Sequence, residues 1–310
     1  MTQRFTRRQT LKLIGAGIAS AWLLPARATA APGAALEKAI PGTDETLPVI
    51  GLGTWRTFNV GSDPQLLNAR AEVVRAFFAQ GGGLIDSSPM YGSAPDVIGY
   101  ALKRLGNPAT LFSAEKVWGP AGGSAREQVA ELAQRWGVKH FDLVQVHNLD
   151  NWRENLAALR EMKAAGQIRY VGITTSHGRR HAEFEQIMAS EDIDFAQMTY
   201  NITHREAEKR LLPLAQEKGV AVIANRPYDG GNLIKGLKGR EQVPEWAVQE
   251  CDCRTWADFL LKFIVSHPAV NCAIPATTRV DHLNENMRAG RDPMPSASTR
   301  RRMVEFIESL

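Results

Sequence analysis

The chain has 310 residues, of which 44% are hydrophobic and 23% charged, which is typical of a water-soluble globular protein with a large core. Its net charge is +4, but the first 30 positions hold five basic residues and no acidic one, and the rest of the chain has one more acidic than basic residue. Because that remainder has no basic stripe with interleaved aromatic residues, these features argue against a nucleic-acid partner.

The first 30 residues have the pattern of an export signal. A pair of arginines at 7–8 precedes an apolar run over 13–24, and the small residues of "ARATA" offer a cleavage site. The run is too short for a membrane span, which needs ~20 apolar residues, although an uncleaved N-terminal anchor is an alternative. The arginine pair resembles the signal read by the twin-arginine export machinery, which carries folded proteins. We therefore expect 1–30 to be removed and the mature chain to reside in a bacterial periplasm without a stable membrane span.

Residues 31–45 are predicted to be a mobile lead-in, and short apolar runs alternate with amphipathic stretches beyond them. The predicted strands are 49–53, 83–86, 111–117, 141–147, 168–173, 195–199, 220–224 and 271–274. The predicted helices are 64–80, 94–106, 124–136, 151–165, 179–189, 205–218, 255–266 and 280–288.

This strand and helix repeat, eight times in ~250 residues, predicts one domain over 46–310 folded as a parallel (β/α)8 TIM barrel. An open doubly wound sheet is the alternative. That fold normally carries a glycine-rich phosphate loop after its first strand, and "GLGTW" at 51–55 lacks the third glycine. The barrel is therefore favoured.

Two stretches stand outside the repeat. Residues 228–250 are too long for an ordinary barrel loop and form either an insertion with a short helix or a lid. The final "TRRRMVEFIESL" is predicted to be a helix. The cysteines Cys251, Cys253 and Cys272 are too few for a disulfide framework or a four-ligand zinc site, so they are core thiols or supply a single disulfide. No pair of His or Cys residues has ligand spacing, and no metal is expected.

Polar residues stand at the ends of three predicted strands: Asp86 and Tyr91 in "LIDSSPMYG", Lys116 in "SAEKVWG" and His147 in "DLVQVHN". In a (β/α)8 barrel, all strand C-termini open onto one face. We therefore expect these four side chains to meet at one mouth.

With these motifs the chain resembles the aldo-keto reductase family over nearly all of its mature length. The resemblance rests on the order and spacing of "GLGTW", "IDSSPMYG", "SAEKVWG", "DLVQVHN", "GQIRYVGITT", "FAQMTYN" and "IPATTRVDHLNEN". It implies NADPH-dependent reduction of aldehyde or ketone carbonyls, with Asp86, Tyr91, Lys116 and His147 as a catalytic tetrad.

The chemistry of carbonyl reduction explains these residue types. Hydride delivery to carbon leaves alkoxide character on oxygen, which needs a proton, and a phenol with a reference pKa near 10 is a poor acid at neutral pH. We expect the ammonium of Lys116 to lower the pKa of Tyr91, and Asp86 to supply the counter-charge for the lysine. His147 would donate a hydrogen bond to the carbonyl oxygen.

Each residue of the tetrad also has a plainer interpretation. Asp86 could cap a helix, and Tyr91 could be a packed loop aromatic. Lys116 could be a surface lysine or the Schiff-base nucleophile of an aldolase, and His147 could be a hydrogen-bonded core histidine.

The cofactor positions match the family less closely. The residues Thr174 and Thr175 stand where the family often has Ser-Asn for the nicotinamide amide, and Gln197 matches a glutamine that reaches the same amide. Asn225 replaces a stacking aromatic, and Arg226 beside it could face the pyrophosphate.

In the last motif, Ala276 and His282 stand where many members have a lysine and an arginine for the 2′-phosphate. Phosphate recognition usually relies on such cations, so NADH is an alternative to NADPH. The remaining candidate cofactor residues of this motif are Thr277, Arg279, Glu285 and Asn286.

Trp55 and Trp118 follow strands at the mouth and either wall a substrate pocket or plug the barrel end. The favoured interpretation is an exported reductase. The alternative is an exported NADP(H)-binding sensor or partner subunit with little turnover, because the nucleotide is not expected free in the periplasm. A different barrel, such as a sugar-modifying enzyme or a lysine-dependent aldolase, is a third possibility.

Overall fold

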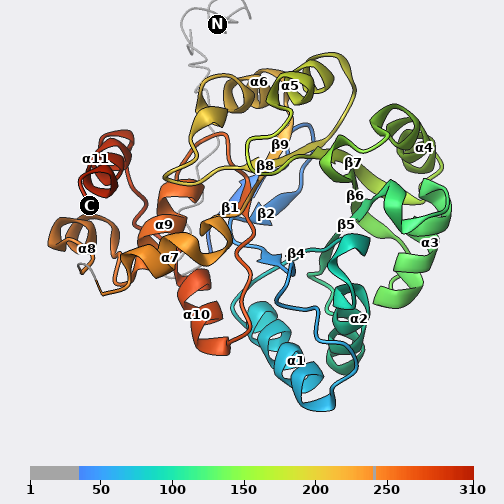
Figure 1. Ribbon diagram of the computed structural model, residues 1–310, viewed down its shortest axis with the longest axis horizontal. Helices are drawn as coiled ribbons and strands as arrows, with labels where there is room; N and C mark the ends of the chain where they lie inside the picture. Colours follow the sequence, from blue (N-terminus) through green and yellow to red (C-terminus); the bar gives the residue numbers. More distant parts are fainter. Residues whose placement is uncertain (1–34, 240–241) are drawn as a thin grey trace, which may run out of the picture. The chain divides into compact units, whose positions relative to one another are not determined.

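The computed structural model describes residues 35–239 and 242–310. The predicted signal at 1–30 and the first part of the lead-in, 31–34, lie outside the described residues. Eight parallel strands pair in chain order from β3 to β10, and the row closes on itself because Ile50 bridges Ala273 and Gly53 bridges Ala276 (Figure 1). This closed barrel confirms the predicted (β/α)8 fold and excludes the open doubly wound sheet.

Each predicted strand is present, within a few residues of its expected bounds. The strands are β3 (Leu52–Gly53), β4 (Leu84–Asp86), β5 (Phe112–Val117), β6 (Phe141–Val146), β7 (Ile168–Thr174), β8 (Phe195–Thr199), β9 (Ala221–Asn225) and β10 (Cys272–Ala273). Alternate side chains point into the barrel or outward against the helices. Asp86 and Lys116 consequently point into the barrel from two neighbouring strands, where they form an ion pair.

The eight predicted helices surround the strands. They are α1 (Pro64–Ala79), α2 (Ala94–Leu105), α3 (Ala125–Trp136), α4 (Trp152–Ala164), α5 (His181–Ser190), α6 (Leu211–Lys218), α9 (Trp256–Val265) and α10 (Val280–Arg288). The helix predicted over 205–218 is wrong at its start, because a separate 3-10 turn (Glu206–Glu208) precedes α6. Pro213 has no N–H and disfavours helical geometry in the residue before it, so a helix tolerates proline only in its first turn.

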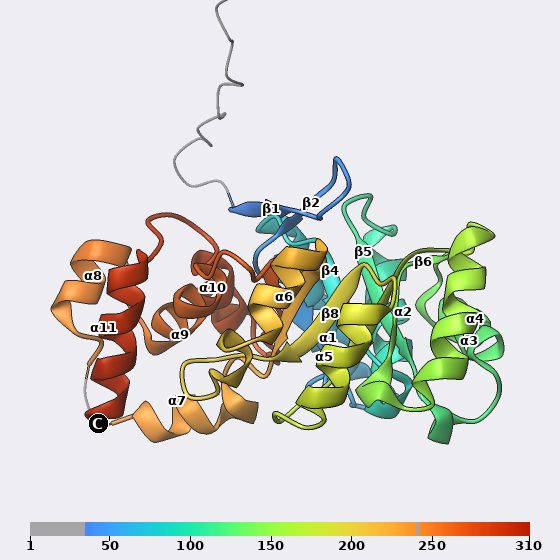
Figure 2. The same ribbon diagram turned by 90° about the horizontal axis from the view of Figure 1, so that it is seen from above.

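The lead-in prediction differs from the structure over the described part of 31–45. Strands β1 (Glu37–Ala39) and β2 (Thr46–Pro48) pair as an antiparallel hairpin, which lies across one end of the barrel in Figure 2. Its Ile40 and Leu47 are buried in the cluster that fills the barrel interior. The Lys38 ammonium donates to three backbone carbonyls at the end of α9 and beyond it, at 2.6–2.8 Å. The hairpin is ordered because it closes the barrel floor.

The stretch 228–250 is an insertion with two short helices, α7 (Asn232–Leu237) and α8 (Glu245–Cys251), and residues 240–241 lie outside the description. The predicted C-terminal helix is α11 (Ala297–Glu308). The three cysteines are buried and unpaired, which agrees with core thiols. Within the described ranges, no helix has the length and apolarity needed to cross a membrane.

Candidate active site

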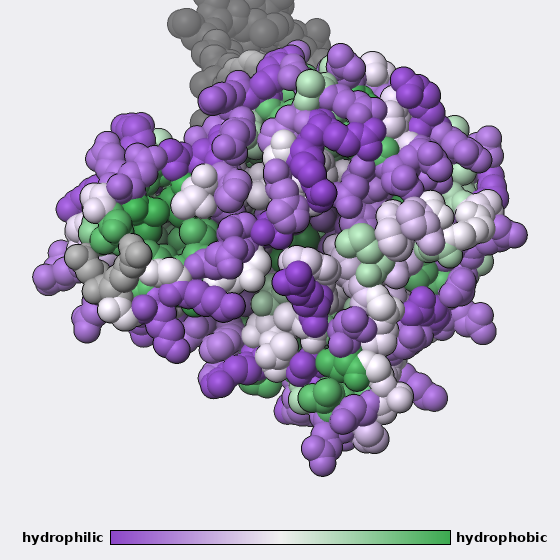
Figure 3. Space-filling view, viewed as in Figure 1, coloured by the Kyte–Doolittle hydropathy of each residue, from purple (hydrophilic) through white to green (hydrophobic). Residues whose placement is uncertain are grey.

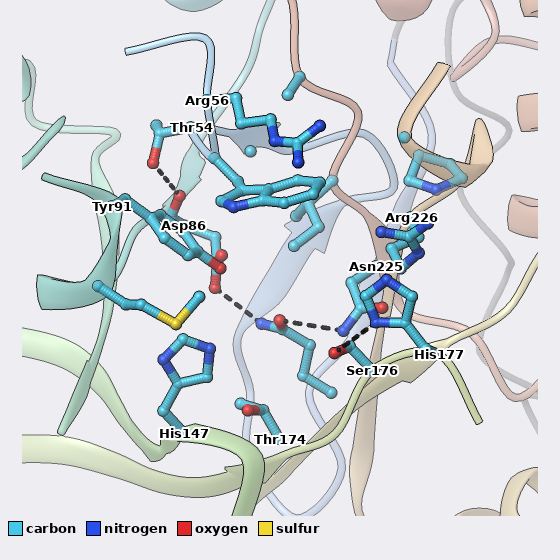
Figure 4. A pocket seen from close by; sticks show the side chains of 18 of the residues that line it. Thr54, Arg56, Asp86, Tyr91, His147, Thr174, Ser176, His177, Asn225 and Arg226 are labelled. Atoms are coloured by element: carbon cyan, nitrogen blue, oxygen red, sulfur yellow. Dashed lines mark hydrogen bonds between the residues drawn. The ribbon is translucent and has the colours of Figure 1, made fainter. Parts of the chain in front are cut away.

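The C-terminal ends of the strands open onto a cavity of about 430 Å³. In Figure 3 this face is hollowed near the barrel centre, with hydrophilic side chains around the hollow. Figure 4 shows Tyr91, Asp86 and His147 on one side of the cavity, and Asn225, Arg226 and His177 on the other. The predicted site residues that line it are Trp55, Asp86, Tyr91, His147, Thr174, Thr175, Gln197, Asn225 and Arg226.

An ion pair lies at the cavity floor. The Lys116 ammonium is 2.7 and 2.8 Å from the two carboxylate oxygens of Asp86 and 2.6 Å from the Ser87 carbonyl oxygen. Lys116 and Asp86 are 0% and 2% exposed. Two charges so deeply buried are tolerated only when each is fully hydrogen-bonded. The expected counter-charge is therefore in place.

Gln197 completes the surroundings of this carboxylate. Its Nε2 donates to Asp86 Oδ1 at 2.7 Å, and Gln145 Nε2 donates to the same oxygen at 3.3 Å. The Gln197 side chain lines the cavity, as expected for a cofactor contact, but its amide N–H is directed at the carboxylate. That bond was not foreseen from the sequence.

Tyr91 ends a 3-10 turn (Pro89–Tyr91) that follows β4. Its ring centroid lies 5.3 Å from the Lys116 ammonium and 5.9 Å from the His147 ring, to which it is edge-on. Burial raises the pKa of Tyr91 well above its ordinary value, and the negative charges of Asp86 and Glu115 raise it further. The expected net lowering of the Tyr91 pKa is wrong, because burial and the neighbouring acids outweigh the attraction of the Lys116 ammonium, which Asp86 and the Ser87 carbonyl already engage.

His147 begins a 3-10 turn (His147–Leu149) after β6 and is 5% exposed. Its Nδ1 lies 2.8 Å from the Ser88 hydroxyl. Burial lowers the pKa of His147 to about 3, and the nearby charges of Lys116 and Arg179 act in the same direction. The imidazole is therefore neutral at physiological pH, and a neutral imidazole has one donor and one acceptor nitrogen.

Hydrogen bonds within the cavity wall hold three of the polar residues expected around the nicotinamide. Thr174 Oγ1 accepts from Asn148 N–H at 2.9 Å. Asn225 Nδ2 donates to the Thr175 carbonyl at 2.8 Å, while Asn225 Oδ1 accepts from Thr199 Oγ1 at 2.7 Å. This network fixes the side chains on the β7, β8 and β9 side of the cavity.

Guanidinium groups flank the Trp55 ring, one of them unpredicted. Arg56 Cζ lies 4.3 Å and Arg226 Cζ 5.8 Å from the ring centroid. Arg226 Nη2 donates to Asp229 at 2.6 Å, while its Nε is buried without a partner. No described carboxylate pairs with Arg56. Its place directly after "GLGTW" is the signal that could have identified it, because that loop carries Trp55 to the mouth.

Other predicted residues lie away from the cavity lining. Trp118 is not among the lining residues, and its ring centroid is 6.4 Å from that of His147. Arg279 is exposed and paired with Asp281 beside it. On α10, Asn286 Oδ1 accepts from Tyr228 Oη at 2.6 Å. Thr277 Oγ1 accepts from the Arg279 N–H, and Glu285 is also on α10. The cavity also has His177 and Arg179 in its wall, which the sequence analysis did not single out.

Among residues 35–239 and 242–310, no three His, Cys, Asp or Glu side chains are grouped so that they could hold a metal ion.

A second buried acid lies behind the lysine. Glu115 is 0% exposed, with Oε1 accepting from the Lys116 N–H at 2.9 Å and Oε2 from Trp136 Nε1 at 3.0 Å. Burial raises the pKa of Glu115 from 4.5 to about 8. The folded protein therefore keeps a proton on Glu115 over a pH range in which the unfolded chain has already lost it.

Glu115→Gln is consequently expected to remove the loss of folding stability that the buried Glu115 causes as pH rises. As pH rises from 4.5 to 8, the wild-type free energy of unfolding should fall relative to the variant, by roughly 3–5 kcal/mol if the full shift is expressed. Urea unfolding of both proteins at pH 5 and pH 8.5 measures this difference. Glu131→Gln, on an exposed position of α3, is the matched control. An unfolding difference between Glu115→Gln and wild type that is equal at both pH values would contradict the prediction.

Comparison with known proteins identifies related chains. Residues 49–301 match the model of the aldo/keto reductase family. Methylglyoxal reductase YeaE of Escherichia coli is 29% identical over 78% of this chain and 85% of its own length. An NADH-specific methylglyoxal reductase of the same organism is 29% identical over 65% of this chain and 70% of its own. A solved aldo/keto reductase of Klebsiella pneumoniae, in complex with NADP and acetate, superposes with a TM-score of 0.70 at 25% identity, covering 86% of this chain and 93% of that one.

Proposed function

The chain belongs to the aldo/keto reductase family and is an oxidoreductase, and from this premise we propose that it reduces aldehyde or ketone groups with NADPH, using Tyr91 as the proton donor. The observation that carries the proposal is the arrangement at the cavity floor. A buried Asp86–Lys116 pair lies beside the Tyr91 ring, and the neutral His147 faces that ring edge-on.

The cavity residues fit a nicotinamide nucleotide. Arg226 has an unpartnered buried Nε, and Arg56 is a guanidinium without a described carboxylate, so the two cations around Trp55 suit a diphosphate. Thr174, Thr175, Gln197 and Asn225 line the same cavity and are the residues that we propose hold the nicotinamide end. A reduced nicotinamide supplies the hydride that the carbonyl carbon receives.

The positions expected to bind the 2′-phosphate of NADPH carry fewer cations than in many members of the family. Ala276 and His282 stand at the two positions discussed above, and the Arg279 charge is shared with Asp281. We expect NADPH to bind, with NADH as a second nucleotide. The two relatives agree with both options, since one solved structure holds NADP and one reductase is described as NADH-specific.

Side chains of the protein supply the proton that the carbonyl oxygen receives during reduction. With its pKa raised, Tyr91 is fully protonated at neutral pH and keeps its hydrogen until a stronger base is present. The oxygen of a carbonyl that is receiving hydride becomes such a base, because an alkoxide is more basic than a phenolate. The Lys116 ammonium beside the ring then favours the phenolate that remains. His147 donates a hydrogen bond to the same oxygen and orients it.

Two measurements on the purified protein test the proposal. NADPH and NADH binding are followed by calorimetry, and oxidation of each is followed at 340 nm with a panel of aldehydes and ketones that includes methylglyoxal, the substrate named for the two relatives. We expect binding and turnover. Tight binding with no turnover on any substrate would favour the sensor or partner-subunit alternative, and no binding would reject both.

We also propose that the protein is exported, on the evidence of the arginine pair and the apolar run in 1–30. Fractionation of producing cells should place a chain that begins near Ala31 in the periplasm. Replacing Arg7 and Arg8 by lysine should retain the chain in the cytoplasm. A full-length chain in the cytoplasm for the unaltered sequence would reject export.

A further inference from the structure

Ser88 joins two parts of the candidate site through one hydroxyl group. It lies between β4 and the turn that carries Tyr91, and it is 0% exposed. Its Oγ accepts a hydrogen bond from the Met90 N–H at 3.2 Å, which caps that turn, and it lies 2.8 Å from Nδ1 of His147. One buried side chain thus contacts both the segment of the phenol and the imidazole ring.

The donors and acceptors around the Ser88 hydroxyl determine the direction of the Ser88–His147 hydrogen bond. A hydroxyl has one proton to donate and two lone pairs to accept with. The Met90 N–H uses one lone pair, and the described chain offers the Ser88 proton no acceptor other than His147 Nδ1. A buried donor left without an acceptor costs free energy, so the hydroxyl donates to Nδ1 and that nitrogen is unprotonated.

The other ring nitrogen is then determined. Since the imidazole is neutral, an unprotonated Nδ1 means that Nε2 bears the ring proton. Nε2 has no hydrogen-bond partner within the described chain, and it is not enclosed by protein, since the ring forms part of the cavity wall. A donor is therefore presented to the space in which a substrate would lie.

We propose that Ser88 is a positioning residue for carbonyl reduction, whose hydroxyl donates to Nδ1 of His147 and so keeps the ring proton on Nε2, where it can donate to the substrate oxygen. The proposal rests on the proposed function for its catalytic consequence, but the tautomer itself does not. In the opposite tautomer, Nε2 would present a lone pair to the carbonyl oxygen and repel it, and the Ser88 proton would be unsatisfied.

The tautomer can be read directly in the unaltered protein. With 15N-labelled histidine, long-range proton–nitrogen correlation spectra distinguish protonated from unprotonated ring nitrogens, and His147→Gln identifies the relevant signals. We expect His147 to show an unprotonated Nδ1 and a protonated Nε2 from pH 5 to pH 8. A protonated Nδ1 would overturn the proposal without any variant of Ser88 having to fold.

Variants then test the link to turnover. Ser88→Ala is expected to lower kcat about tenfold, the scale of one lost hydrogen bond, while nucleotide affinity stays the same, and Ser88→Thr should recover part of kcat. The matched control is Ser87→Ala, which removes a neighbouring buried hydroxyl that has no partner and should leave the His147 tautomer unchanged. An unaltered kcat in Ser88→Ala would reject the positioning role. If instead the wild-type protein has the expected tautomer but reduces no carbonyl, the proposed reductase function is rejected while the tautomer assignment stands.

Discussion

Replacing Tyr91 by phenylalanine is expected to lower kcat for aldehyde reduction by about 10²–10⁴-fold, the contribution of a positioned general acid. The substitution removes one oxygen and leaves the ring, which packs beside Lys116 and His147. The hydride acceptor would still bind, but its oxygen would lose the phenol as its proton donor and keep only the hydrogen bond from His147. Steady-state rates and nucleotide affinity of the variant, measured with the best substrate of the panel, check the prediction.

Tyr100→Phe is the matched control for this substitution. Tyr100 is on α2, where its hydroxyl donates to Asn68 at 2.7 Å, away from the cavity. It should have the wild-type kcat. If Tyr91→Phe retained kcat within a factor of a few, the proton would have to come from another group or from water, and the assigned role would fail. A variant with intact kcat but raised KM would assign the phenol to binding alone.

The pH dependence of the wild-type rate follows from the same geometry. Because burial and the charges of Asp86 and Glu115 raise the pKa of Tyr91, the phenol stays protonated through the neutral and mildly alkaline range. The low pKa of His147, about 3, keeps the imidazole neutral over the same range. Neither group should therefore produce a limb in the pH profile of kcat between pH 5 and pH 8.

The meeting of Asp86 and Lys116 could be predicted from the sequence because topology alone determines it. Both residues end neighbouring parallel strands, and the registers of β4 with β5 bring their side chains to one end of the barrel. The direction of the Tyr91 pKa could not be predicted, since it depends on distances. The ammonium is 2.7 and 2.8 Å from the two carboxylate oxygens of Asp86 but 5.3 Å from the Tyr91 ring centroid. Burial and the neighbouring acids Asp86 and Glu115 raise the pKa of the phenol.

Contacts between particular side chains were the other feature that could not be predicted from the sequence. The sequence places Ser88 beside Tyr91 but gives no sign that its hydroxyl reaches a residue 59 positions away. Likewise, the sequence shows only that Arg56 follows the "GLGTW" motif, and it is the structure that shows the guanidinium over the Trp55 ring. The β1–β2 hairpin was missed for a related reason. Its strands have three residues each, and what orders them is contact with the barrel floor and with α9.

The second large effect is expected from Lys116→Met, which removes the cation and keeps most of the side-chain volume. Asp86 would remain 2% exposed with only the amides of Gln145 and Gln197 as charge-stabilising donors. Breaking a buried ion pair on one side typically costs 3–5 kcal/mol, because the remaining charge stays desolvated. Urea unfolding at pH 7 should show a loss of about this size in the free energy of unfolding, together with loss of activity.

The double variant Lys116→Met with Asp86→Asn separates desolvation from packing. Neutralising the abandoned carboxylate should return much of the lost stability, so the two single changes will not be additive. Acid should act in the same direction on Lys116→Met alone. Protonation at low pH removes the charge of a buried carboxylate that has lost its cation, so the deficit against wild type should shrink as pH falls. Two results would contradict this prediction: a loss of unfolding free energy under about 1 kcal/mol at pH 7, or a loss that changes neither with pH nor with the second substitution. Either result would mean that the Lys116 ammonium does not balance the charge of Asp86, and the role proposed for Lys116 beside Tyr91 would be rejected.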